Sequence, residues 1–203
     1  MCSTSIKYLF FALCVVFVPS VPLLAAERAA KSAYMPLGKG MLPPFSFTKF
    51  CVRKPERCTT SKNVRQIPFD ADHRKQLEQV QHSVNRSFSG LERWNDDATI
   101  NDCTDFALTK RSRLLDLGFP SSAVLIAVAF VPDGEAHLLV VVVTDHGDFV
   151  LDNLRKEVTR WDRLPYRWVM RSSPQDPKEW QAILPLYVGK GFESFESSLA
   201  VCR

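Results

Sequence analysis

Hydrophobic residues recur at helical spacing in the middle of the chain. Four apolar positions between Asp72 and Phe88 lie three or four residues apart, which predicts an amphipathic helix. These positions are Leu77, Val80, Val84 and Phe88. A second helix is predicted from Cys103 to Leu117, a run without glycine or proline that Gly118 and Pro120 terminate. Residues 27–66 contain several prolines without clear periodicity, so we expect extended strand and loop there.

Three strands are predicted after the second helix. Apolar and β-branched residues fill the runs Ala123 to Phe130, Ala136 to Thr144 and Phe149 to Leu154. Turns at Asp133-Gly134 and His146-Gly147 would join them into an antiparallel meander. The middle run is apolar at both odd and even positions, which indicates a central strand that is covered on both faces. The pattern is that of an α+β fold.

Two further segments are less regular. Residues 89–101 are polar and are expected to form a loop before the second helix. Near the C-terminus, Tyr166 to Trp168 and Pro174 to Trp180 are candidates for another strand and a short helix.

The N-terminus has the pattern of a secretory signal peptide. Lys7 precedes an uncharged apolar stretch from Tyr8 to Val18, and small residues follow at Ala25 and Ala26. An uncleaved membrane anchor is the alternative, although Pro19 would interrupt a spanning helix. We expect residues 1–26 to be a signal peptide and residues 27–203 one domain, periplasmic or secreted and without stable membrane insertion.

The amino-acid composition indicates a globular protein. The chain has 203 residues, of which 46% are hydrophobic and 24% charged, as in an ordinary globular protein. The net charge is +4 and the basic residues are dispersed, so nothing indicates a nucleic-acid partner. We expect a monomer.

Removal of the signal peptide would leave four cysteines, and export permits disulfides. Four cysteines allow three pairings, but locality favours a Cys51–Cys58 bond across a short loop that contains Pro55. Cys103 could then pair with Cys202 or remain free, and we expect the free thiol. Zinc is disfavoured because the chain has no C-x-x-C and no H-x-x-x-H motif.

Three residues that cooperate in thiol chemistry occur in the order Cys103, His137 and Asp152. A helix N-terminus favours ionisation of a thiol, a histidine can act as its base, and an acid can orient that histidine. Each residue also has an ordinary structural explanation: a buried cysteine, a structural histidine and a turn residue. Spacing alone therefore does not establish a catalytic triad.

Longer sequence segments around these three residues resemble those of a known protein family. They are Asn101-Asp102-Cys103-Thr104-Asp105-Phe106-Ala107, Leu117-Gly118-Phe119-Pro120, Glu135-Ala136-His137-Leu138 and Val150-Leu151-Asp152-Asn153-Leu154. Together they resemble the bacterial transglutaminase-like cysteine proteinases, a family that includes the calcium-dependent periplasmic LapG proteases. The resemblance implies a papain-like or transglutaminase-like core in which a cysteine helix packs on an antiparallel sheet. It also implies that Cys103 is the nucleophile, His137 the base and Asp152 the acid.

The resemblance is incomplete at the position that follows the nucleophile. The calcium-binding members have a pattern like Asp-Cys-Glu-Asp, whereas this chain has Thr104 between Cys103 and Asp105. Calcium prefers six to eight oxygen ligands, so the loss of a carboxylate should weaken or abolish a site. Asp102 and Asp105 remain possible calcium ligands, although capping and first-turn roles suit them as well. We expect no required cofactor.

The predicted hairpin raises a geometric difficulty. A turn centred on His146-Gly147 would pair Asp152 with Val141, on the face of His137 but about 13 Å away along the strand. A shifted turn or a β-bulge would be needed to bring the acid and the base together.

The sequence favours an exported thiol hydrolase, a cysteine peptidase whose partner is a protein or peptide substrate. One alternative is an acyl transferase, a transglutaminase that uses the same three residues. Another is a non-catalytic binding or regulatory domain with the same fold, which a structural Cys103–Cys202 disulfide would favour.

Overall fold

An antiparallel sheet of seven strands organises the structure, a computed structural model that describes residues 32–60, 64–87 and 103–186. The strand order is β1-β7-β6-β2-β3-β4-β5, and every neighbouring pair is antiparallel. The strands are β1 (Leu37–Met41), β2 (Val124–Phe130), β3 (Ala136–Thr144), β4 (Gly147–Leu151), β5 (Thr159–Arg160), β6 (Arg167–Ser172) and β7 (Trp180–Ile183). The predicted signal peptide, the loop 89–101, Asp102 and Cys202 lie outside the described residues.

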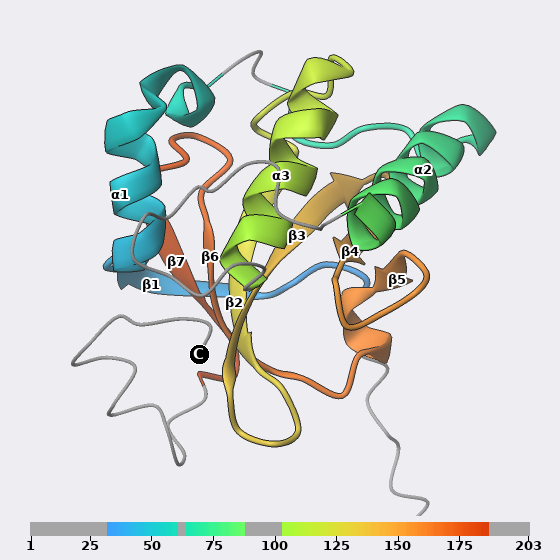
Figure 1. The fold of residues 1–203 in the computed structure, drawn as a ribbon. Coiled ribbons are helices and arrows are strands. Elements are labelled where there is room, and N and C mark those ends of the chain that lie inside the picture. Colours follow the sequence, from blue (N-terminus) through green and yellow to red (C-terminus); the bar gives the residue numbers. More distant parts are fainter. Residues whose placement is uncertain (1–31, 61–63, 88–102, 187–203) are drawn as a thin grey trace, which may run out of the picture. The chain divides into compact units, whose positions relative to one another are not determined.

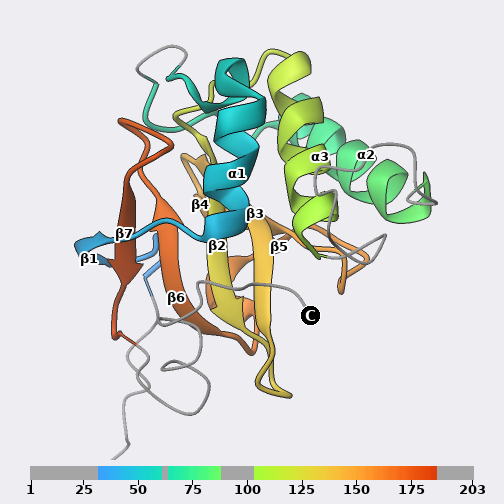
Figure 2. The same ribbon diagram turned by 60° about the vertical axis from the view of Figure 1, so that its left-hand side comes forward.

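Three α-helices cover one face of this sheet (Figures 1 and 2). They are α1 (Phe45–Arg53), α2 (Ala71–Ser87) and α3 (Cys103–Asp116), and two short 3₁₀ helices, η1 (Pro55–Cys58) and η2 (Trp161–Arg163), complete the helical elements of the described residues. α1 packs on β7 through an edge-to-face contact between Phe47 and Trp180, whose ring centroids are 5.4 Å apart. α3 packs on β2 and β3, with α2 beside it. The predicted helix that begins at Cys103 therefore lies over the centre of the sheet.

The two central strands separate two hydrophobic clusters. Every residue of β2 is buried, and β3 is buried from His137 onward. Val140 and Val142 belong to the cluster under the helices, whereas Leu139 and Val141 belong to the cluster on the opposite face. The prediction of a central strand covered on both faces is confirmed.

The face opposite the helices is covered partly by the chain that precedes β1. The Trp161 indole donates hydrogen bonds to the carbonyls of Ser32 and Ala33, at 3.1 and 3.0 Å. The backbone N–H of Met35 donates to Asp148 Oδ2 at 2.8 Å. Gly147 has φ 116°, and a Cβ there would lie 2.5 Å from the Ala33 carbonyl oxygen, so a larger residue would displace this segment.

Most predicted elements are present, and two predictions are wrong. The helices of 72–88 and 103–117 correspond to α2 and α3, and the meander corresponds to β2, β3 and β4. Residues 45–53, expected to be extended or loop, form α1, because Phe47 and Phe50 bury one face of a short helix. The segment from Pro174 to Trp180 is not a helix; it is a loop that leads into β7.

The structure contains the Cys51–Cys58 disulfide, with the two Cα atoms 5.5 Å apart. The bond joins α1 to η1, the segment that the Arg111 side chain of α3 also holds. Arg111 donates to the Arg57 carbonyl at 2.6 Å and to the Val124 carbonyl at 3.1 Å. The disulfide loop is thereby attached to the helix that begins at Cys103.

None of the helices in the described part of the chain has the length and apolar character that a membrane span requires.

Candidate active site

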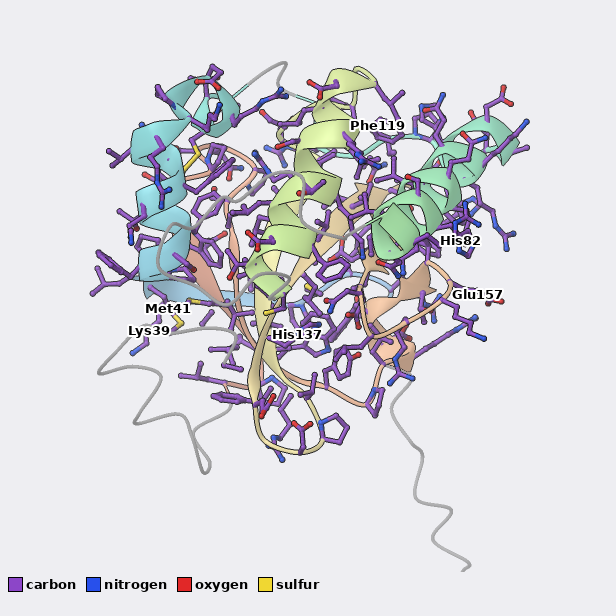
Figure 3. All side chains as sticks on the ribbon, in the orientation of Figure 1. Lys39, Met41, His82, Phe119, His137 and Glu157 are labelled. Atoms are coloured by element: carbon purple, nitrogen blue, oxygen red, sulfur yellow. A yellow bond between two sulfur atoms is a disulfide. The ribbon has the colours of Figure 1, made fainter. Side chains whose placement is uncertain are left out.

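Cys103 is the first residue of α3 and lies against the edge of β3. Its Sγ accepts a hydrogen bond from the backbone N–H of Leu138 at 3.1 Å. This donor is available because β4 pairs with β3 only as far as Leu151, opposite Val140. Beyond that point the Cys103 sulfur, rather than a carbonyl of β4, accepts the hydrogen bond from β3. Figure 3 shows His137, the neighbour of Leu138, below the end of α3 at which the helix begins.

His137 and Asp152 meet where β4 ends. His137 Nε2 lies 2.8 Å from Asp152 Oδ1, and both side chains are buried. The predicted turn was wrong by one residue: Thr144 pairs with Gly147, so the loop is Asp145-His146. This register moves Asp152 two residues, roughly 7 Å, closer to His137 than the sequence suggested. No β-bulge interrupts the pairing of β3 with β4.

The hydrogen bond to Asp152 determines the tautomer of His137. Burial alone would raise the pKa of Asp152, but hydrogen bonds and the charge interaction with His137 outweigh it and hold the pKa below its usual value. An ionised carboxylate only accepts hydrogen bonds, so Nε2 carries the proton. In the neutral imidazole, Nδ1 then has the lone pair that a general base requires.

Asp152 has further donors on its carboxylate. The Leu154 backbone N–H donates to Oδ1 at 2.9 Å, and the Tyr166 hydroxyl donates to Oδ2 at 2.5 Å. Burial, followed by the bond to Asp152, raises the pKa of Tyr166 to about 12, so this hydroxyl keeps its proton at neutral pH. The orientation of the carboxylate is therefore fixed at both oxygens.

The backbone of Asp152 is held by α2. Gln81 is fully buried; its Nε2 donates to the Asp152 carbonyl at 2.7 Å and its Oε1 accepts from the Asp152 N–H at 3.1 Å. The same Nε2 donates to the Arg155 carbonyl at 2.8 Å, and so does Asn85 Nδ2 at 2.9 Å. A helix more than sixty residues earlier in the chain thus positions the loop that follows β4.

Lys110 adds a buried amine to this region. Its side chain is fully buried on α3, and Nζ has no hydrogen-bond partner among the described residues. Burial lowers the pKa of Lys110 to about 7, while the charge of Asp152 acts in the opposite direction. A protonated Lys110 amine and the Asp152 carboxylate stabilise each other through their opposite charges.

Cys103 is a disulfide cysteine in the structure. Cys51 and Cys58 pair with each other, so its partner lies outside the described residues. This differs from the free thiol expected from the sequence. A nucleophile at this position belongs to the reduced form of the protein.

Two other acidic residues near His137 and Asp152 in the sequence have different partners. Asp148 lies in β4 and pairs with Arg171 at 2.9 Å. Glu135 lies in the loop before β3, where its N–H binds Asp133. In the described structure it is Asp152, and neither of these two, that contacts His137.

Of the two calcium ligands considered from the sequence, Asp105 alone lies within the described residues. Asp105 is buried in the first turn of α3, next to the buried Thr104, and Asp102 lies outside the described part. Among the described residues there is no group of three or more His, Cys, Asp and Glu that could hold a metal ion.

A family model described as bacterial transglutaminase-like cysteine proteinase matches residues 38–186. The chain belongs to this family. It is accordingly a cysteine peptidase with an α+β, transglutaminase-like core, and the resemblance found in the sequence is confirmed. No curated protein matches the chain.

Among solved structures, the chain is similar to LapG of Legionella pneumophila. The calcium-bound form is 19% identical with a TM-score of 0.46, and the match covers 76% of this chain and 87% of that one. The EGTA-treated form is 19% identical with a TM-score of 0.45 and coverages of 76% and 86%. A third LapG structure is 16% identical with a TM-score of 0.43 and the same coverages.

Sequence reasoning missed two residues of the site, Gln81 and Tyr166. A signal existed for Gln81, which is a polar residue four positions after Leu77 and thus within the apolar stripe of the predicted helix. No comparable signal marks Tyr166, because aromatic residues next to strands are common in hydrophobic cores.

Gln81→Leu tests how the loop of Asp152 is held. The substitution keeps a side chain of similar size but removes the partner of two buried backbone groups, so unfolding should become about 1–3 kcal/mol easier. Turnover should fall further than the folded fraction explains, because Asp152 loses its position. Urea unfolding and initial rates measure the two effects. Gln79→Leu is the control, since Gln79 is exposed on the same helix; equal behaviour of the two variants would contradict this role.

Proposed function

We propose that the protein is an exported cysteine peptidase in which Cys103, His137 and Asp152 form the catalytic triad. The observation that carries this proposal is the pair His137 Nε2 and Asp152 Oδ1, 2.8 Å apart, beside a cysteine at the start of a helix. Nδ1 of His137, the ring nitrogen that does not contact Asp152, is the atom that would exchange a proton with the Cys103 thiol. Membership of a cysteine proteinase family supports the same assignment.

In the proposed reaction, His137 Nδ1 takes the proton of the reduced Cys103 thiol, and the thiolate attacks a peptide carbonyl carbon. The C–S bond forms as electrons move to the carbonyl oxygen, which the N–H groups at the start of α3 can stabilise. Collapse of this intermediate breaks the C–N bond, and the imidazolium protonates the leaving amine. Water, deprotonated by His137, then hydrolyses the thioester and restores the thiol.

The Leu138 N–H contributes to the ionised state of the sulfur. It is a fixed donor 3.1 Å from Sγ, in a site where Cys103 is 8% exposed and His137 5% exposed. A hydrogen bond to a charged acceptor is stronger than one to a neutral acceptor, so this donor favours the thiolate over the thiol.

The proposed location is the periplasm or the cell exterior. The apolar N-terminal segment supports export, and the Cys51–Cys58 disulfide is typical of oxidising compartments. The proposed substrate is a protein in the same compartment, and the enzyme is proposed to act as a monomer.

A second function is favoured by one observation. Cys103 is oxidised in the structure, and a permanent disulfide at this position would make the domain a non-catalytic binding module. Transfer of the acyl group to an amine is a further outcome of the same chemistry and would be detected as an isopeptide product.

The triad is tested with the reduced full-length mature protein and a proteome-derived peptide library, from which a cleaved peptide is chosen for kinetics. Cys103→Ala and His137→Ala should each lower kcat by at least about 10³-fold, and the double variant should be scarcely worse. Asp152→Asn should retain part of the activity, because it disturbs only the tautomer and orientation of His137.

The control for these variants is His73→Ala. His73 also pairs with an aspartate, Asp70, at 2.8 Å, but both side chains are substantially exposed and remote in sequence from the triad. This variant should keep wild-type turnover. Wild-type turnover in Cys103→Ala would exclude the proposed reaction.

Calcium is proposed not to be required, because Thr104 stands where calcium-binding relatives have an acidic residue. Addition of EGTA to the reduced enzyme should leave the initial rate within about twofold of its value in calcium. Complete loss of activity, restored by micromolar calcium, would show that the remaining carboxylates suffice for a functional site.

A further inference from the structure

We propose that Tyr166 is a positioning residue for the acid of the triad, an inference that rests on the proposed function. Tyr166 precedes β6 and would hold the Asp152 carboxylate in the rotation that presents Oδ1 to His137.

The contacts of Tyr166 reach both partners of the pair. Its hydroxyl lies 2.5 Å from Asp152 Oδ2, the oxygen that His137 does not use. Its ring meets the imidazole of His137 edge to face, with centroids 6.3 Å apart and an interplanar angle of 76°. Tyr166 is 7% exposed, so water does not replace the hydroxyl easily. One side chain therefore orients the acid and packs against the base.

The contact with Arg155 shows that Tyr166 is the donor in its hydrogen bond to Asp152. Arg155 Nε lies 3.3 Å from the Tyr166 oxygen, and the guanidinium carbon lies 5.6 Å from the centre of the tyrosine ring. A guanidinium can only donate, so the tyrosine oxygen accepts from Arg155 and its own proton is directed to Asp152. The Trp168 ring also packs against Tyr166, with the two ring centroids 6.0 Å apart.

Loss of the hydroxyl should change the protonation of Asp152 as well as its geometry. The titratable groups that face Asp152 are His137 of β3, Tyr166 before β6, Arg155 of the following loop and Lys110 of α3; Gln81 of α2 is uncharged. Without Tyr166, one carboxylate oxygen loses its donor, and the pKa of Asp152 rises. The carboxylate is the active form, so activity should begin to fall at a higher pH as the solution is acidified.

The test is Tyr166→Phe in the reduced mature protein, with kcat and KM measured against pH on the peptide found above. The phenyl ring preserves the contacts with His137 and Trp168. We expect kcat to fall about tenfold with little change in KM, and the acid limb of kcat/KM to move to higher pH. Urea unfolding of the variant reports whether it is folded.

Tyr34→Phe is the matched control, because the Tyr34 hydroxyl donates to the Asp145 carbonyl at 3.1 Å, at an exposed position far from the triad in the fold. It should leave kcat and the pH profile unchanged. A Tyr166→Phe enzyme with the wild-type profile, or one with lower kcat and an unmoved acid limb, would overturn the positioning role. If Asp152→Asn loses part of its activity in the same series, the proposed triad stands; if Cys103→Ala keeps wild-type activity, the proposed function itself fails.

Discussion

The hydrogen bond between His137 and Asp152 depends on where β4 stops pairing with β3. The pairing ends at Val140 and Leu151, so the chain leaves the sheet one residue before the acid. The exposed edge of β3 then receives the Cys103 sulfur from α3, through the Leu138 N–H. Continued pairing would fill this edge with backbone and separate the three side chains.

Elements distant in sequence hold the site at the end of the β3–β4 pairing in place. α2 holds the backbone of Asp152 through Gln81, and the segment before β6 holds its carboxylate through Tyr166. On the side of Cys103, Arg111 joins α3 to the disulfide loop of Cys51 and Cys58. The three residues of the proposed triad are thus supported by three other parts of the chain.

The sequence predicted the elements that carry the three residues but not the contacts that align them. A helix from Cys103 follows from local composition, and the β3 strand follows from a strongly β-branched run. The pairing register of β3 and β4 does not follow from the sequence, because the turn could be centred at either of two adjacent positions within Asp145-His146-Gly147. A shift of the turn by one residue changes the β3 partner of every β4 residue by two positions. α1 was missed because a helix of nine residues between prolines depends on tertiary packing of Phe47 and Phe50.

The central claim of this account is that reduced Cys103 is an activated nucleophile. The most direct measurement is to reduce the mature protein, treat it with a biotinylated peptidyl electrophile between pH 5 and 10, and map the labelled cysteine by mass spectrometry. The account predicts labelling of Cys103 with a midpoint well below the value of about 8.5 for a model thiol, and a higher midpoint in His137→Ala. An unshifted midpoint, or no labelling of Cys103 in the folded reduced protein, would contradict it.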